Sequence, residues 1–165
     1  MKIYKSIFYV CSLFLLVAFT TVSNITEPTK KYKCMVQLKN YEGEGAYVVV
    51  SVVDKNDQYL KTVQILGDDK KWYADLSTWW SFFEKAKQPN TDAITGATIA
   101  GGERSIFVFQ LNEKDLNKGY KLRFETAVEQ QDYHLKDLEI SLDNNNLKDK
   151  HEGTGYIRYV RILPN

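Results

Sequence analysis

The stretch YVVVSVVDKNDQYLKTVQIL, residues 47–66, decides the fold. It holds two runs rich in β-branched and aromatic residues, 47–53 and 59–66, and such residues favour strands. The polar segment Asp54-Lys55-Asn56-Asp57 separates the two runs and is typical of a turn. The stretch therefore predicts a β-hairpin.

Five further runs of the same kind predict strands around this hairpin: 32–39, 105–111, 120–128, 135–142 and 156–163. In the run from Tyr120, apolar residues alternate with Lys121, Arg123 and Glu125, which predicts a strand with one solvated face. Seven short strands joined by turns favour an all-β, antiparallel sandwich of immunoglobulin-like kind. The polar segment 143–155 is expected to be a solvated hairpin loop.

One segment between these strands has helical rather than strand periodicity. Its large apolar residues recur at i, i+4, i+7, i+8 and i+11 and so share one helix face: Trp72, Leu76, Trp79, Trp80 and Phe83. Asp75 or Ser77 would cap the start of this helix, and Pro89 lies just past its end. The aromatic stripe is expected to be core, and stacking on a flat ligand is the alternative.

The N-terminus has the pattern of a secretory signal peptide. Lys2 and Lys5 precede an apolar run of 13 residues, 7–19, which is short of a membrane span. We expect residues 1–23 to be removed on export, 24–31 to form a linker and 32–165 to form a single sandwich domain. Cys34 is then the one remaining cysteine, and burial in the core is the favoured interpretation over a reactive thiol.

Composition excludes several functional classes. The chain of 165 residues has a net charge of +1, so no basic field points to nucleic acid. Its two histidines and the remaining cysteine lack the spacing of metal ligands, so no metal site is expected. No nucleophile, acid or base constellation is present either, which argues against a hydrolase and leaves the catalytic residues as none.

The loop after the helix, 90–102, is rich in small residues and about a dozen residues long, and such loops tend to be functional. Within it, five residues stand at the spacing Asp-x-x-Thr-Gly-Ala-Thr: Asp92, Thr95, Gly96, Ala97 and Thr98. This pattern resembles the attachment motif for covalently bound FMN in the flavin-carrying subunits of sodium-pumping NADH:quinone reductases.

That resemblance implies a phosphoester between FMN and the hydroxyl of Thr98. A separate, Mg-dependent FMN transferase of the ApbE type would form it from FAD. Gly96 and Ala97 would leave room for the transferase, and Asp92 would fix the loop by hydrogen bonds to backbone amides. Trp79 and Trp80 are then possible flavin contacts.

The chain as a whole, over about 32–163, also resembles an uncharacterised family of predicted periplasmic domains encoded near flavin transferases. Besides the loop, the resemblance rests on three groups of residues: Val53-Asp54 with Tyr59, Leu76 with Trp79-Trp80, and Gly119-Tyr120-Lys121-Leu122 with Glu125. The chain departs from that family at Gly101-Gly102-Glu103 and at Phe109-Gln110.

Two functions follow as expectations. The first is an exported, periplasmic or otherwise extracytoplasmic flavoprotein that carries FMN on Thr98 and transfers electrons between extracytoplasmic or membrane redox proteins. It would be a carrier rather than an enzyme with its own substrate. The alternative is a cofactor-free, immunoglobulin-like binding or adaptor module of an envelope complex, in which the Trp79-Trp80 helix docks a partner.

Overall fold

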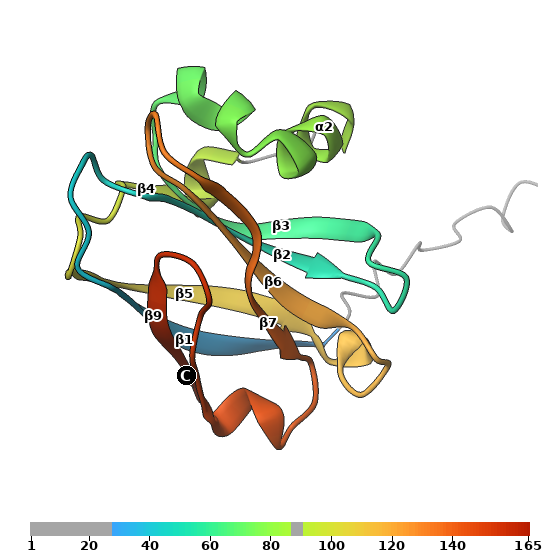
Figure 1. Ribbon diagram of the computed structural model, residues 1–165. Helices are drawn as coiled ribbons and strands as arrows, with labels where there is room; N and C mark the ends of the chain where they lie inside the picture. The colour runs from blue at the N-terminus through green and yellow to red at the C-terminus, as the bar shows by residue number, and fades with distance from the viewer. Residues whose placement is uncertain (1–27, 87–90) are drawn as a thin grey trace, which may run out of the picture.

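The computed structural model describes residues 28–86 and 91–165, which form two facing β-sheets (Figure 1). The first sheet has the order β5 (Arg104–Asn112), β1 (Thr29–Leu38), β9 (Ile157–Pro164), β8 (Lys150–His151). The second has the order β4 (Thr95–Gly96), β3 (Tyr59–Leu66), β2 (Tyr47–Val53), β6 (Lys121–Ala127), β7 (Tyr133–Ser141). All pairs are antiparallel except β3 with β4.

The main core fills the space between the two sheets. It is built from alternate residues of the central strands, among them Val36, Val50, Leu122 and Phe124, all fully buried. Cys34 lies there too, with no exposed surface, and burial raises the pKa of its thiol. The predicted all-β sandwich with one helix and the predicted burial of Cys34 are confirmed.

The predicted strands match the observed ones closely. β2 and β3 have the bounds expected from the sequence. β1 begins at Thr29 rather than at 32, because Thr29 pairs with Asn112 of β5 and Glu113 N donates to Pro28 O at 3.0 Å. Residues 29–31, expected to belong to a linker, are therefore part of the sheet.

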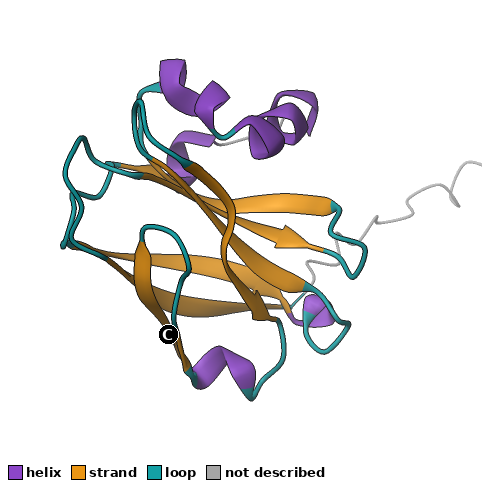
Figure 2. Cartoon of the chain, viewed as in Figure 1, coloured by secondary structure: helices purple, strands orange, loops and turns teal. Residues whose placement is uncertain are grey.

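The helical insert is two short helices rather than one (Figure 2). A 3₁₀ helix, η2 (Lys70–Asp75), is followed by α2 (Ser77–Ala86), and the chain turns at Leu76 between them. Asp69 caps η2 by accepting a hydrogen bond from Lys71 N at 3.2 Å. α2 begins at Ser77, one of the two predicted start positions; Pro89 lies outside the described residues.

Two segments predicted to be plain loops contain structure. The segment 143–155 holds η5 (Asn146–Lys148) and β8, and Leu147 is buried in the main core, so its description as a solvated loop was wrong. The segment 90–102 holds the 3₁₀ helix η3 (Thr91–Ile94) and β4. A further 3₁₀ helix, η4 (Glu113–Asp115), follows β5.

The outer faces of the two sheets differ. η2 and α2 cover the outer face of the second sheet (Figure 1), where Val49, Ile65, Tyr73, Leu76 and Trp79 form a second buried cluster. We call this the covered face. The outer face of the β5-β1-β9-β8 sheet carries exposed Ile106, Val108 and Leu163, and we call it the bare face.

Candidate functional site

Thr98 stands on a short arch between two attachment points of the chain. On one side Gly96 pairs with Leu66 of β3, and Gly67 N donates to Gly96 O at 2.6 Å. On the other side Ile99 is buried and forms a bridge with Ala46 through hydrogen bonds of 2.8 and 3.1 Å. Only Ala97 and Thr98 lie between these anchors; both are exposed and outside any strand. We call them the 97–98 arch.

The side chain of Thr98 lies against the backbone of Gly45. A Cβ atom at position 45 would fall 2.4 Å from Thr98 Oγ1, which is far inside van der Waals contact. Gly45 therefore leaves the space that the Thr98 side chain occupies. The same turn borders a surface hollow of about 360 Å³, lined by Gly43, Glu44, Glu129, Gln130 and Gln131. The turn 43–45 thus contributes Gly43 and Glu44 to the hollow and Gly45 to the contact with Thr98.

The two threonines of the motif have different environments. Thr95 is half-buried in β4, and its hydroxyl donates to Thr91 O at 2.9 Å. Thr98 is exposed. Of the two threonines, Thr98 is the exposed one, and the hydroxyl of Thr95 holds η3 to β4.

The structure places Asp92 at the surface, at the start of the loop. It lies in the first turn of η3, and its side chain is 96% exposed. Its carboxylate is 4.0 Å from Lys70 Nζ, an exposed ion pair that contributes little stability. That Asp92 fixes the loop through backbone amides stays a prediction. The short β4 and the bridge at Ile99 tie the loop to the sandwich.

Trp79 and Trp80 take different positions. Trp79 has no exposed surface, its indole N–H donates to Thr62 Oγ1 at 2.9 Å, and its ring packs on Tyr73 and Phe83. Trp80 is half-buried. Because Trp79 is enclosed, it cannot stack on a ligand, and the interpretation of the stripe as core holds for it. β4 and the loop after it run to the left end of the sandwich in Figure 1, whereas α2 lies to the right.

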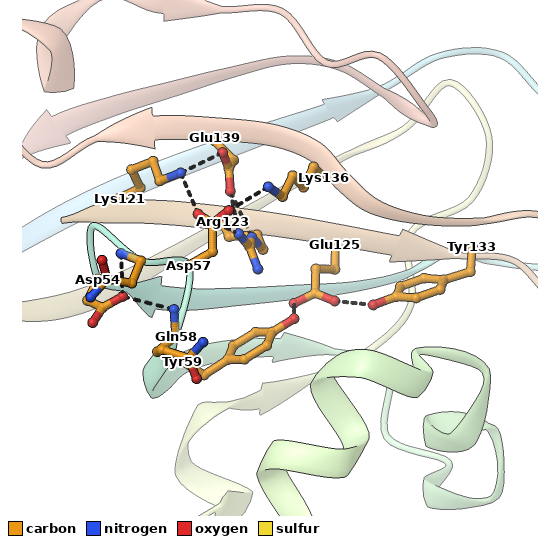
Figure 3. A network of polar contacts seen from close by, with 11 residues as sticks. Asp54, Asp57, Gln58, Tyr59, Lys121, Arg123, Glu125, Tyr133, Lys136 and Glu139 are labelled. Carbon is orange, nitrogen blue, oxygen red and sulfur yellow. Dashed lines mark hydrogen bonds and ion pairs between the residues drawn. The ribbon is translucent and has the colours of Figure 1, made fainter. Parts of the chain in front are cut away.

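A buried polar cluster beneath the insert was missed by the sequence analysis (Figure 3). Glu125 of β6 has no exposed surface and accepts hydrogen bonds from Tyr59 Oη, at 2.7 Å, and from Tyr133 Oη. Burial raises the pKa of Glu125 to about 7, although the two tyrosine hydroxyls and Arg123 favour its ionised form. Burial and the neighbouring Glu125 carboxyl raise the pKa of both tyrosines.

Arg123 extends this cluster along β6. It is 2% exposed, and its guanidinium contacts Glu139 at 2.8 Å and Asp57 at 3.0 Å. Lys121 donates to the same two carboxylates, at 3.0 and 2.7 Å. The predicted solvated face of this strand was therefore wrong at Arg123 and Glu125. The sequence does contain a signal that could have predicted this burial. The aromatic stripe of the insert must pack on the face of a sheet, and that face is then buried.

Other site chemistry is absent from the described parts of the chain. Within residues 28–86 and 91–165, no three metal-ligating side chains come together, and no helix has the length and apolar character of a membrane span. Cys34, the candidate thiol, is enclosed in the core. Two candidate functional features remain: the exposed Thr98 on the 97–98 arch and the buried Glu125 cluster.

Together these features define a β-sandwich domain with an anchored, exposed threonine. Residues 29–159 match the model of a family described as "Predicted periplasmic protein (DUF2271)", and the chain belongs to this family. The protein is accordingly periplasmic. No curated protein matches the chain, and no solved structure does either.

Proposed function

We propose that this periplasmic domain is an electron carrier whose FMN is esterified to Thr98. The observation that carries the proposal is the exposed Thr98 on the 97–98 arch, at the last position of an Asp-x-x-Thr-Gly-Ala-Thr pattern. A second enzyme must reach the acceptor hydroxyl, so a threonine buried in a sheet would not serve. Thr98 meets this requirement, and Thr95 does not.

The surroundings of the arch fit a tethered flavin. Gly45 leaves the space that the Thr98 side chain occupies, and the hollow bordered by Gly43 and Glu44 is a candidate position for a ring system. A covalent tether also suits a periplasmic protein, because a detached cofactor would be lost and a tethered one rebinds intramolecularly. When bound, FMN would supply the redox chemistry, and the chain would position it and set its environment.

The loading step balances without a redox partner. The hydroxyl oxygen of Thr98 bonds to the FMN-side phosphorus of FAD, and the bond from that phosphorus to the AMP phosphate oxygen breaks. The hydroxyl proton passes to a base of the Mg-dependent, ApbE-type transferase, and AMP leaves. The chain gains one FMN and loses one water relative to the free components.

Intact-mass measurement of the mature chain, co-expressed with an ApbE-type transferase, tests the proposal. We expect the mass to rise by one FMN less one water. Thr98→Ala should abolish the gain, while Thr98→Ser, which keeps a hydroxyl, should retain it. Thr95→Ala serves as the matched control and should retain attachment, because Thr95 is not the acceptor. An unmodified mass for the parent chain with an active transferase contradicts the proposal.

The second candidate is a cofactor-free binding or adaptor module of an envelope complex. The bare face gives this candidate a surface, because Ile106, Val108 and Leu163 are exposed there and a partner would cover them. Colour separates the two functions. A native protein without yellow colour or flavin fluorescence supports the adaptor, and a yellow protein whose colour survives denaturation supports the flavin carrier.

A further inference from the structure

The bare face has an unusual distribution of charge. On β1 its side chains alternate with the buried residues Tyr32, Cys34 and Val36. The residues of β5 and β9 that pair with these outward positions of β1 lie on the same face. Five of these outward side chains are basic: Lys31, Lys33, Arg104, Lys150 and Arg161. No carboxylate occupies an outward strand position of the described part of this sheet. The face is therefore strongly positive although the chain as a whole has a net charge of +1.

Four of the five basic residues of this face lack an ion-pair partner among the described residues. Lys31, Lys33, Arg104 and Arg161 form no ion pair with the described residues, and only Lys150 does, with Glu152 at 2.9 Å. Arg161 and Lys150 stand directly opposite each other in the sheet, where like charges are destabilising. An external anion would relieve this repulsion.

Aliphatic side chains lie between these charges. Ile106, Val108 and Leu163 are 53%, 49% and 54% exposed. In the register, Lys33 lies between Val108 and Leu163, and Met35 lies between Ile106 and Arg161. At a membrane surface, long basic side chains can keep their charges beside the lipid phosphates, while neighbouring aliphatic side chains enter the boundary between the headgroups and the acyl chains.

We propose that the bare face docks on a membrane surface rich in anionic phospholipids. Charge complementarity argues for an anionic occupant. The apolar residues argue for a lipid rather than an acidic protein, because Ile, Val and Leu project from a continuous sheet surface across β5 and β9. In protein-binding hot spots, by contrast, Leu and Val are under-represented. The periplasmic location puts membrane within reach of the face.

Sedimentation with vesicles tests this docking surface. The mature chain, from residue 24, is mixed with vesicles of phosphatidylglycerol and phosphatidylcholine or of phosphatidylcholine alone, at low and high salt. We expect binding to the anionic vesicles and a loss of that binding at high salt. Binding to pure phosphatidylcholine that equals binding to the anionic vesicles overturns the proposal.

Paired variants locate the contact. The double variant Lys33→Gln/Arg161→Gln should lower the partition coefficient by roughly 25-fold, since each basic residue near an anionic surface is worth about a five-fold change. The matched control, Lys70→Gln/Lys85→Gln, removes the same charge from the covered face and should lower binding by much less. Equal losses in the two variants overturn the proposal, because they indicate an effect of net charge alone.

A third variant tests the apolar contribution. Ile106→Ser/Val108→Ser should weaken binding while leaving its salt dependence in place. Failure of the parent chain to bind anionic vesicles removes the membrane as the occupant of the face. A concentration-dependent dimer that this variant abolishes assigns it to a second copy of the chain. Either result overturns the membrane proposal, and neither affects the mass test at Thr98.

Discussion

The covered face and the bare face are built from the same kind of sequence, but one is buried and the other is exposed to solvent. β6 presents Lys121, Arg123 and Glu125 on alternate positions, and β1 presents Lys31 and Lys33 in the same way. On β6, Arg123 and Glu125 are buried beneath the insert; on β1, the two lysines are exposed. Alternation thus identifies a two-sided strand, and the remainder of the chain decides which side meets water.

This difference also sets what each face contributes. The covered face buries aromatic rings and a carboxyl whose charge must be accommodated, so substitutions there should alter stability and its pH dependence. The bare face buries little in the free protein, so substitutions there should alter binding and leave stability nearly unchanged.

The largest expected effect is the removal of the buried indole from the covered face. Trp79→Ala should lower the free energy of unfolding by about 3–5 kcal/mol, because it leaves a cavity and removes the hydrogen bond to Thr62 Oγ1. Urea unfolding followed by far-UV circular dichroism measures this loss. Trp80→Ala, at a half-buried position, is the control and should cost less. Equal costs would show that the insert does not pack as described.

The next effect is a pH dependence that arises from Glu125. Its folded pKa of about 7 lies above the ordinary value of 4.5, so folding favours the protonated carboxyl. Its contribution to stability is therefore greatest below about pH 4.5 and falls as the pH rises towards 7. The total fall is on the order of 3 kcal/mol.

Glu125→Gln should remove this fall. Unfolding of the parent and the variant is compared between pH 5 and pH 8, and we expect the difference between the two free energies to change across that window. Parallel curves would contradict the raised pKa of Glu125.

A smaller effect is expected for one of the two tyrosines that bind Glu125. Tyr59→Phe removes a hydroxyl that donates to Glu125 Oε1 at 2.7 Å. The loss should be about 1.5–3 kcal/mol at pH 8, where the carboxylate is charged, and about 1 kcal/mol at pH 5, where it is neutral. Thermal and urea unfolding at the two pH values check this. A loss that is the same at both would show that Tyr59 acts only by packing.

The smallest effect is expected on the bare face, and one matched pair isolates the comparison. Val108→Thr changes an exposed residue and should alter stability by no more than about 0.5 kcal/mol. Val49→Thr makes the same change at a buried position of the covered face and should cost about 1–3 kcal/mol, because it buries a hydroxyl. A reversed order would mean that the two faces have been assigned wrongly.

Local patterns were sufficient to predict most of the sandwich. β2 and β3 begin and end where β-branched runs meet turn residues, so local chemistry determines their bounds. The helical insert was predicted as a single helix because its aromatic residues share a face. The break at Leu76 follows from packing, since Tyr73, Leu76 and Trp79 all enter the same buried cluster.

The candidate site was predictable only in part. Motif spacing singled out Thr98, whose exposure the structure supplies. β4 was missed because a two-residue strand has no periodicity and exists only through pairing with β3. The Glu125 cluster was missed for a similar reason: Tyr59, Glu125 and Tyr133 come from three strands, and no local pattern links them.

The shortness of the 97–98 arch bears on when the proposed attachment of FMN to Thr98 would take place. Because Gly96 and Ile99 both pair with the sandwich, only the two residues of the arch are free of backbone pairing, and they cannot extend far from the surface. A transferase that modifies the folded domain must therefore bind the edge of the sandwich, whereas one that acts during secretion would bind an unfolded peptide. Whether a synthetic peptide of residues 90–102 is accepted as readily as the whole domain would reveal which comes first, folding or loading.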